Sequence, residues 1–206
     1  MNADQVAALR LLLAPTGWLD RTRFFAQALR GCSRTPQGLL VVGTPDDEPW
    51  HMTAHLADEA RLAGIPELTP TLVRWAPPPG APAHLRIGME RLAVAGRRET
   101  LLVVSPGAAA AELLERVDDV RRAGATIFSL DRGDPDLGAL AHEALAVPEG
   151  VAPLSFDAAQ HLVSAAAGGP PGSDRLRMGT ERTSLRGRLA HLLNMVSGPP
   201  PSAPDC

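Results

Sequence analysis

The chain has 206 residues and a formal net charge of −3, from 20 basic and 23 acidic side chains. This length suits one well-buried domain, and the scattered, nearly balanced charge argues against the strong positive field of proteins that bind nucleic acid or acidic membranes. Every basic residue is Arg and none is Lys, which excludes Schiff-base chemistry and a Walker-type phosphate lysine.

The cysteines and the hydropathy of the sequence indicate in which cellular compartment the protein is expected. The two cysteines, Cys32 and Cys206, lie far apart and form neither a metal-binding motif nor a secreted disulfide framework. The sequence contains no run of about 18 apolar residues, and its first residues lack the basic-then-apolar pattern of a signal peptide. We therefore expect a cytoplasmic protein that binds neither nucleic acid nor a membrane.

The N-terminal region, residues 1–36, predicts two helices ahead of any strand. Apolar residues recur at helical spacing over 4–13 and over 18–30, and Gly31 follows as a stop signal. The apolar positions are Val6, Leu9 and Leu13 in the first helix and Trp18, Phe25 and Leu29 in the second. Apolar stripes of this kind usually pack against a core or a second subunit, so we expect packing or dimerisation elements here.

The central region, residues 37–168, alternates short apolar strands with helices. Strands are predicted at 39–43, 71–75, 100–104, 125–130 and 143–147. Helices are predicted at 84–95, 108–123, 137–142 and 155–167, and a further helix follows the turn 43–49 and ends near Ala63 and Gly64. Continuous apolar runs such as LLVV suit strands that are covered on both faces of a parallel sheet. The pattern predicts a three-layer α/β/α sandwich with a five-stranded parallel sheet.

Three segments follow this core. Residues 169–179 have the Gly and Pro content of a linker, and residues 198–206 have the composition of a disordered tail. Between them, residues 180–197 place leucines at helical intervals with arginines mostly on the other face. This pattern predicts a docked C-terminal helix with a solvated basic side, and nucleic-acid contact is the less favoured interpretation.

The turns after the first and third predicted strands are the expected ligand sites, because parallel sheets bind ligands at the carboxyl ends of their strands. In the later turn, Ser105 is predicted to cap a helix, Pro106 to begin it, and Gly107 to let a ligand approach the backbone. An anion could bind the free amides at Ser105, Gly107 and Ala108. The alternative is a simple helix cap that binds nothing.

The earlier turn begins with Gly43 and Thr44 but continues with three carboxylates, at Asp46, Asp47 and Glu48. These carboxylates could cap the following helix from within, and they would repel a phosphate. Internal capping is the favoured interpretation. A metal that bridges the carboxylates to a ligand is the alternative.

Histidine spacing marks the helix that follows the first turn. His51, His55 and Glu59 recur at i, i+4 and i+8, so all three project from one face. This spacing can supply transition-metal ligands or an acid/base carboxylate beside an imidazole, although a solvated surface stripe has the same pattern. His161 on the closing helix could complete such a site if that helix crosses the same strand ends.

Four segments of the region 37–168 follow one known pattern. They are the strand and glycine at 39–43, the HLADE segment at 55–59, the strand and turn at 101–107, and the RRAGATIFSL segment at 121–130. On these segments the region resembles a sugar isomerase (SIS) domain, in particular the phosphoheptose isomerase group. The motifs are degenerate, because the first turn is acidic and the second keeps only one hydroxyl. The family's pair of Gln and His, eight residues apart on the closing helix, is also missing.

The resemblance implies roles for particular residues. Phosphoheptose isomerases bind phosphosugars at a dimer interface and move protons between C1 and C2 with a helix Glu and a closing-helix His, often with zinc. By position, the catalytic residues would be Glu59 and His161, and zinc would be held by His55 and Glu59. The substrate contacts would be Gly43, Thr44, Ser105, Gly107 and Ala108.

Two functions follow from this comparison of motifs. The first is a phosphosugar-binding protein, in the form of a homodimer or homotetramer, that retains a divergent sugar-phosphate isomerase activity. The alternative is a catalytically silent SIS scaffold that acts in protein assembly or regulation. Metal-dependent hydrolysis through Asp46, Asp47, His51 and His55 is the least favoured, because these residues have no fixed ligand geometry in the sequence.

Overall fold

The computed structural model describes residues 17–147 and 155–169. Apart from residues 17–19, the described residues belong to one compact unit, residues 20–171. The predicted helices at 4–13 and 180–197, nearly all of the predicted linker, and the predicted tail lie outside the described residues. No helix of the described ranges is both long and apolar enough to cross a membrane.

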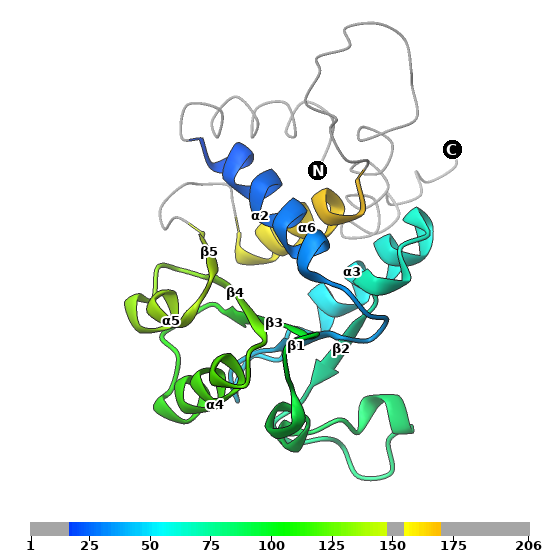
Figure 1. The fold of residues 1–206 in the computed structure, drawn as a ribbon, viewed down its shortest axis with the longest axis vertical. Helices are drawn as coiled ribbons and strands as arrows, with labels where there is room; N and C mark the ends of the chain where they lie inside the picture. The colour runs from blue at the N-terminus through cyan, green and yellow to red at the C-terminus, as the bar shows by residue number, and fades with distance from the viewer. Residues whose placement is uncertain (1–16, 148–154, 170–206) are drawn as a thin grey trace, which may run out of the picture. The chain divides into compact units, whose positions relative to one another are not determined.

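A parallel sheet of five strands forms the centre of the described unit (Figure 1). The strands are β1 (Leu39–Val42), β2 (Pro70–Val73), β3 (Thr100–Ser105), β4 (Thr126–Asp131) and β5 (Glu143–Ala146), in the order β2-β1-β3-β4-β5. Leu39 lies opposite Pro70 on one side and Thr100 on the other. Every residue of β1 and β3 is buried, which confirms the expectation from their continuous apolar runs.

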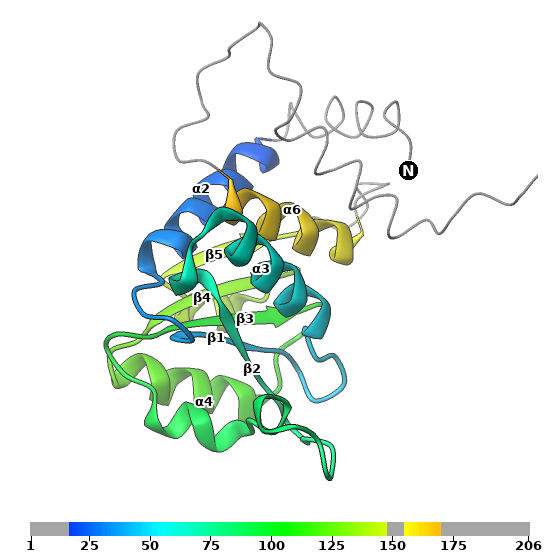
Figure 2. The same ribbon diagram turned by 90° about the vertical axis from the view of Figure 1, so that its right-hand side faces the viewer.

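Helices cover both faces of this sheet, so the predicted three-layer architecture is confirmed (Figure 2). One face carries α2 (Trp18–Cys32), α3 (Trp50–Ala63) and α6 (Phe156–Gly168). The other carries α4 (Ala111–Arg122) and α5 (Pro135–Leu140), as Figure 1 shows. On the α4 face, alternate strand residues such as Leu40 and Val103 form a core with Leu113 and Val117. On the α2 face, the rings of Phe25 and Phe128 meet edge-on, with centroids 5.3 Å apart.

Several predicted helices differ from the structure, and α2 continues through the predicted stop at Gly31 to Cys32. The segment predicted as a helix at 84–95 forms two short 3-10 turns, η3 (Ala83–Leu85) and η4 (Met89–Val94). Between them, Ile87 accepts a hydrogen bond from the backbone N–H of Arg74, just beyond β2, at 2.9 Å, so the chain is held extended beside the sheet. A third 3-10 turn, η2 (Pro66–Leu68), joins α3 to β2. A further difference is α4, which begins later than predicted, at Ala111.

The strand order creates a switch point between β1 and β3. These strands are adjacent, but the chain leaves β1 for α3 on one face and leaves β3 for α4 on the other (Figure 2). In open parallel sheets, ligands bind at the carboxyl ends of the strands where the connections diverge in this way. The turns 43–49 and 106–110 both lie at this edge, as expected from the sequence.

Candidate functional site

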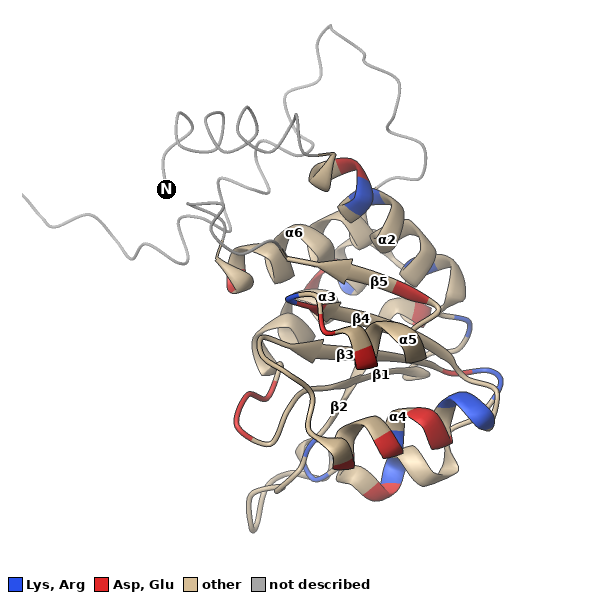
Figure 3. Cartoon of the chain, turned by 90° about the vertical axis from the view of Figure 1, so that its left-hand side faces the viewer, with Lys and Arg blue, Asp and Glu red and all other residues tan. Residues whose placement is uncertain are grey.

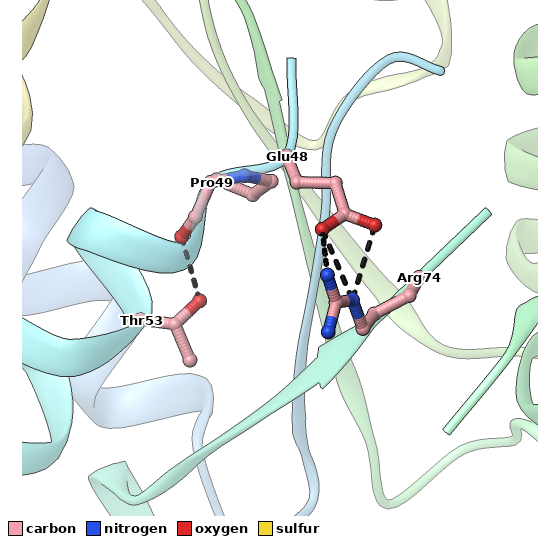
Figure 4. Close-up of polar contacts among 4 residues, drawn as sticks. All are labelled: Glu48, Pro49, Thr53 and Arg74. Atoms are coloured by element: carbon pink, nitrogen blue, oxygen red, sulfur yellow. Dashed lines mark hydrogen bonds and ion pairs between the residues drawn. The ribbon is translucent and has the colours of Figure 1, made fainter. Parts of the chain in front are cut away.

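Helix α3 positions two of the candidate histidines. It begins after Pro49, whose carbonyl accepts hydrogen bonds from the backbone N–H and the hydroxyl of Thr53, at 3.0 and 2.8 Å (Figure 4). It ends at Gly64, whose positive φ of 67° is the left-handed cap conformation that glycine adopts without strain. Because His51 and His55 are one turn apart, their side chains lie on the same face of the helix.

Helix α6 supplies the third histidine. The hydroxyl of Ser155 accepts a hydrogen bond from the Ala158 N–H at 3.1 Å and so caps the helix start. Helix α6 packs against α3 (Figure 2), and both helices begin at the carboxyl edge of the sheet. His161, in the second turn of α6, therefore faces the first turns of α3, as the sequence predicted for a closing helix that crosses the same strand ends.

The three imidazoles converge. The ring centroid of His161 lies 4.1 Å from that of His55 and 4.7 Å from that of His51, and the His51 and His55 centroids are 4.7 Å apart. One nitrogen from each ring lies within 4.8 Å of the other two. We name this group the histidine cluster. Among the described residues it is the group of side chains best arranged to hold a metal ion.

The surroundings of two members of the cluster, His161 and His55, favour the uncharged imidazole. Burial, together with the neighbouring His55 and His51, lowers the pKa of His161 to about 4, although Asp157 acts in the opposite direction. Burial and His51 likewise lower the pKa of His55, against the effect of Asp58. At neutral pH these rings are therefore neutral, which is the protonation state that coordinates a metal. The buried Nδ1 of His161 has no hydrogen-bond partner within residues 17–147 and 155–169.

These residues fit a transition-metal ion. Imidazole nitrogen is a good ligand for zinc, and three protein ligands with an open fourth position are typical of catalytic zinc sites. Zinc–nitrogen bonds of about 2.0–2.1 Å place tetrahedral ligand nitrogens about 3.4 Å apart. The 4.8 Å limit on the cluster is wider than this, so small rotations of the half-buried imidazoles would be needed to complete the coordination.

Glu59 does not join this group of ligand atoms. Its side chain is 5% exposed and packs against the C-terminal end of α6, where a Cβ added to Gly168 would lie 2.7 Å from the Cβ of Glu59. The resemblance implied that His55 and Glu59 share a metal. The structure instead brings His55 together with His51 and His161. His51 was visible from its i, i+4 spacing, but that spacing could not choose between it and Glu59 as the third ligand.

The turn after β3 differs from the predicted anion site. Ser105 is the last residue of β3, and its buried hydroxyl donates to the Gly107 carbonyl at 2.7 Å instead of capping α4. The N-cap of α4 is Ala110, which offers no side-chain cap, and the nearby Ala109 N–H donates to Asp134 at 2.7 Å. The predicted Ser105 cap is therefore wrong. Gly107 and Ala108 are exposed.

The turn after β1 also differs from its prediction. None of its carboxylates caps α3 in the described part of the chain. The hydroxyl of Thr44 accepts from the Asp47 N–H at 3.1 Å, which stabilises the turn itself. Gly43 is required by close packing, since an added Cβ would lie 2.6 Å from the Pro49 side chain. The predicted internal capping is wrong, and the turn is instead fixed by contacts with its neighbours.

An arginine that the sequence analysis did not single out neutralises part of this turn. Arg74, directly after β2, binds the Glu48 carboxylate in a bidentate pair, with Nη2 2.6 Å from Oε2 and Nε 3.1 Å from Oε1 (Figure 4). The indole N–H of Trp75 donates to the Gly43 carbonyl at 2.9 Å. Both contacts link the residues after β2 to the turn after β1. A predicted pairing of these two strands could therefore have revealed the contacts from the sequence.

Elsewhere in the described unit, acidic and basic side chains are mixed along the surface of the same elements. Figure 3 shows acidic and basic residues side by side along α4, where Arg122 pairs with Asp118 at 2.5 Å. Such mixed surfaces produce no extended field of one sign. The distribution of charge thus gives no support to a nucleic-acid interface on these elements.

Thirteen chains of solved structures match this chain, and three of them are described here. No family model and no curated protein matches the chain. A candidate sugar binding protein from Salmonella typhimurium LT2 aligns with a TM-score of 0.49 and 18% identity, over 78% of this chain and 46% of its own. A candidate phosphosugar isomerase from the same organism aligns with a TM-score of 0.48 and 11% identity, over 72% and 43%.

A second candidate phosphosugar isomerase, from Silicibacter pomeroyi DSS-3, aligns with a TM-score of 0.49 and 16% identity, over 80% of this chain and 48% of its own. The chain therefore spans a little under half the length of each of these three proteins. Similarity at this level does not identify a ligand or a reaction.

Proposed function

We propose that this chain is an SIS-like protein that binds a divalent transition metal, with zinc as the first candidate, and a sugar phosphate or related sugar derivative beside it. The observation that carries the proposal is the convergence of His51, His55 and His161 from two helices at the carboxyl edge of the sheet. Two of these imidazoles are held neutral by their surroundings, which prepares them as ligands.

The chain's own residues would supply the binding geometry. Three imidazoles leave one coordination position open for water or a ligand oxygen, and a bound metal would act there as a Lewis acid toward a sugar hydroxyl or carbonyl. The exposed backbone at Gly107 and Ala108 lies at the same edge of the sheet and could meet a second part of the ligand. Thr44 and Gly43 hold the first turn in place instead of offering free donors.

The resemblance would add an isomerase activity through Glu59 and His161 to this binding function, and the geometry argues against that addition. Such an activity requires a general acid or base within hydrogen-bond reach of the substrate. Glu59 is buried against Gly168, and His161 faces the other two histidines, so the geometry favours ligand binding over proton transfer. Incubation with sedoheptulose 7-phosphate and other ketose phosphates, with and without zinc, tests for this activity. We expect little or no turnover.

Zinc binding is the direct test of the main proposal. Titration of the metal-free protein against a chelator of known affinity should show one zinc ion per chain. Because each ligand contributes to the site, His51→Ala, His55→Ala and His161→Ala should each weaken binding at least 10-fold. His142→Ala is the control and should leave zinc affinity unchanged, because the Nδ1 of His142 accepts from the Ile127 N–H at 2.9 Å and the residue is not part of the cluster. Equal zinc affinity in all four variants would contradict the proposal.

The silent scaffold is the second candidate, and the turn after β3 favours it. Ser105 and the Ala109 amide are already engaged within the protein, so they offer no free donors to a phosphate. Thermal-shift measurements with a panel of sugar phosphates, with zinc present, distinguish the scaffold from a sugar-phosphate-binding protein. A ligand at about 100 times its Kd stabilises the fold by about 2.7 kcal/mol. A flat panel would favour the scaffold. The dimer or tetramer expected from the resemblance remains a prediction.

A further inference from the structure

An exposed aromatic side chain lies beside the histidine cluster. Trp50, the first residue of α3, is 64% exposed. Burying a large apolar side chain stabilises a folded protein, and the exposed indole of Trp50 does not make that contribution. Scattered exposed apolar residues are ordinary on protein surfaces. The position of Trp50 is what distinguishes it.

Trp50 is in contact with the cluster itself. Its indole is stacked on the ring of His51, with centroids 5.2 Å apart and the planes inclined by 19°. The His51 ring in turn contacts His55 and His161. The indole therefore extends the cluster outward from α3 as a flat, solvent-facing surface. A ligand that reaches the open position of a metal on these histidines would lie within reach of that surface.

Two carboxylates interact electrostatically with each other near the histidine cluster, and one of them also acts on His161. Asp47 in the turn after β1 and Asp157 in the first turn of α6 are both exposed. Partial desolvation and the negative charge of Asp157 raise the pKa of Asp47, and the charge of Asp157 also acts on His161. Gln160 donates from Nε2 to Asp157 at 3.3 Å, and its buried Oε1 has no partner in the described ranges. The hydrogen bond from Gln160 therefore restrains the Asp157 carboxylate.

An indole next to two carboxylates favours one class of ligand over another. The C–H face of a sugar ring is apolar and packs on an indole, while its hydroxyls donate hydrogen bonds to carboxylates. A phosphate group, in contrast, would meet two negative charges. The surroundings of the histidine cluster are therefore suited to the uncharged part of a sugar.

We propose that Trp50 is the stacking platform of a carbohydrate subsite, rimmed by Asp47 and Asp157, that takes the hydroxyl-bearing ring of a sugar and disfavours its phosphate. This inference rests on the proposed function, because it assumes a metal bound to the histidine cluster beside the subsite. The stacking of the sugar on Trp50 does not itself depend on the metal. Trp50 thus contacts the sugar ring directly, and any phosphate of the ligand points away from the cluster.

Saturation-transfer NMR on the zinc-loaded chain tests the subsite. The probes are fructose and sedoheptulose, each compared with its phosphate ester. In the wild type, saturation should reach the ring C–H protons, and the neutral sugars should bind at least as tightly as their esters. Trp50→Ala should raise the Kd for the neutral sugars about 2- to 10-fold, the range expected for loss of one aromatic contact, and Trp50→Phe should retain most of the affinity. Leu62→Ala, an equally exposed apolar change on α3, is the control.

A second pair of variants tests the rim. Asp47→Asn with Asp157→Asn should relieve the repulsion and make the phosphate esters bind more tightly than the neutral sugars. Zinc titration of the same samples reports separately on the metal centre, so a failure of the subsite is distinguishable from a failure of the metal proposal. Unchanged affinity in Trp50→Ala, no binding of either neutral sugar, or preference of the wild type for the esters would each overturn the subsite.

Discussion

At the scale of single residues, the most informative feature is a histidine that the fold keeps uncharged. His161 carries a buried Nδ1 that has no partner within the described ranges, and its pKa is lowered to about 4. An unpaired buried polar atom is unfavourable by about 1–3 kcal/mol. Metal coordination would satisfy it, which gives a physical reason for this arrangement.

The lowered pKa of His161 makes the stability of the metal-free protein depend on pH. Between pH 6.5 and about 4, the unfolded chain binds a proton at this residue and the folded chain does not, so stability should fall as the pH is lowered through this window. His161→Asn removes this contribution. Urea unfolding in chelator from pH 7.5 to 4 should give a shallower slope for the variant. Parallel curves would contradict the pKa shift.

Gly168 marks the closest approach of α6 to Glu59. A Cβ there would lie 2.7 Å from the Cβ of Glu59, which a rotation of the Glu59 side chain cannot relieve. We expect Gly168→Ala to lower the free energy of unfolding by about 1–3 kcal/mol, as for other overpacked sites.

The matched control for this packing prediction is Gly31→Ala. Gly31 is exposed in α2 with open space around its Cα, so alanine should raise the free energy of unfolding, by up to about 1 kcal/mol, through helix propensity. Urea denaturation measures both variants. A stabilising effect at Gly168 would show that α3 and α6 are packed more loosely than the structure indicates.

At the scale of elements, the sequence predicted the strands well because burial on both faces leaves a simple mark, a run of apolar residues. LLVV in β1 and TLLVVS in β3 fall where expected. The start of α4 was misplaced because its partner is distant in the sequence: the Ala109 N–H is taken by Asp134, 25 residues later. Local capping rules cannot detect such a partner.

Asp134 therefore joins two elements, and its loss should affect both. Burial raises its pKa, but hydrogen bonds from the Ala109, Leu137 and Asp136 N–H groups outweigh this, so the pKa lies below its usual value. Asp134→Ala should lower the free energy of unfolding by about 1–2 kcal/mol, the upper range for a lost cap. Asp136→Ala in the same turn is the control and should have a smaller effect. Equal losses would argue against the bridging role.

At the scale of the whole described unit, topology assembles the site. The order β2-β1-β3-β4-β5 places the starts of α3 and α6 on one face of the sheet, at its carboxyl edge. The spacing of His51 and His55 was readable from the sequence, but the contribution of His161 depended on how α6 crosses α3. Glu59 is not among the cluster's ligand atoms because it is buried against Gly168 of α6. The residue pattern of α3 alone cannot predict this contact with another helix.

The central claim is that His51, His55 and His161 bind one metal ion. The most direct measurement is anomalous diffraction from a crystal grown with zinc, recorded on both sides of the zinc absorption edge. The account predicts one strong peak about 2.0–2.1 Å from a nitrogen of each of the three histidines. A peak bound by Glu59 without His51, or no peak at this position while the protein carries zinc elsewhere, would contradict it.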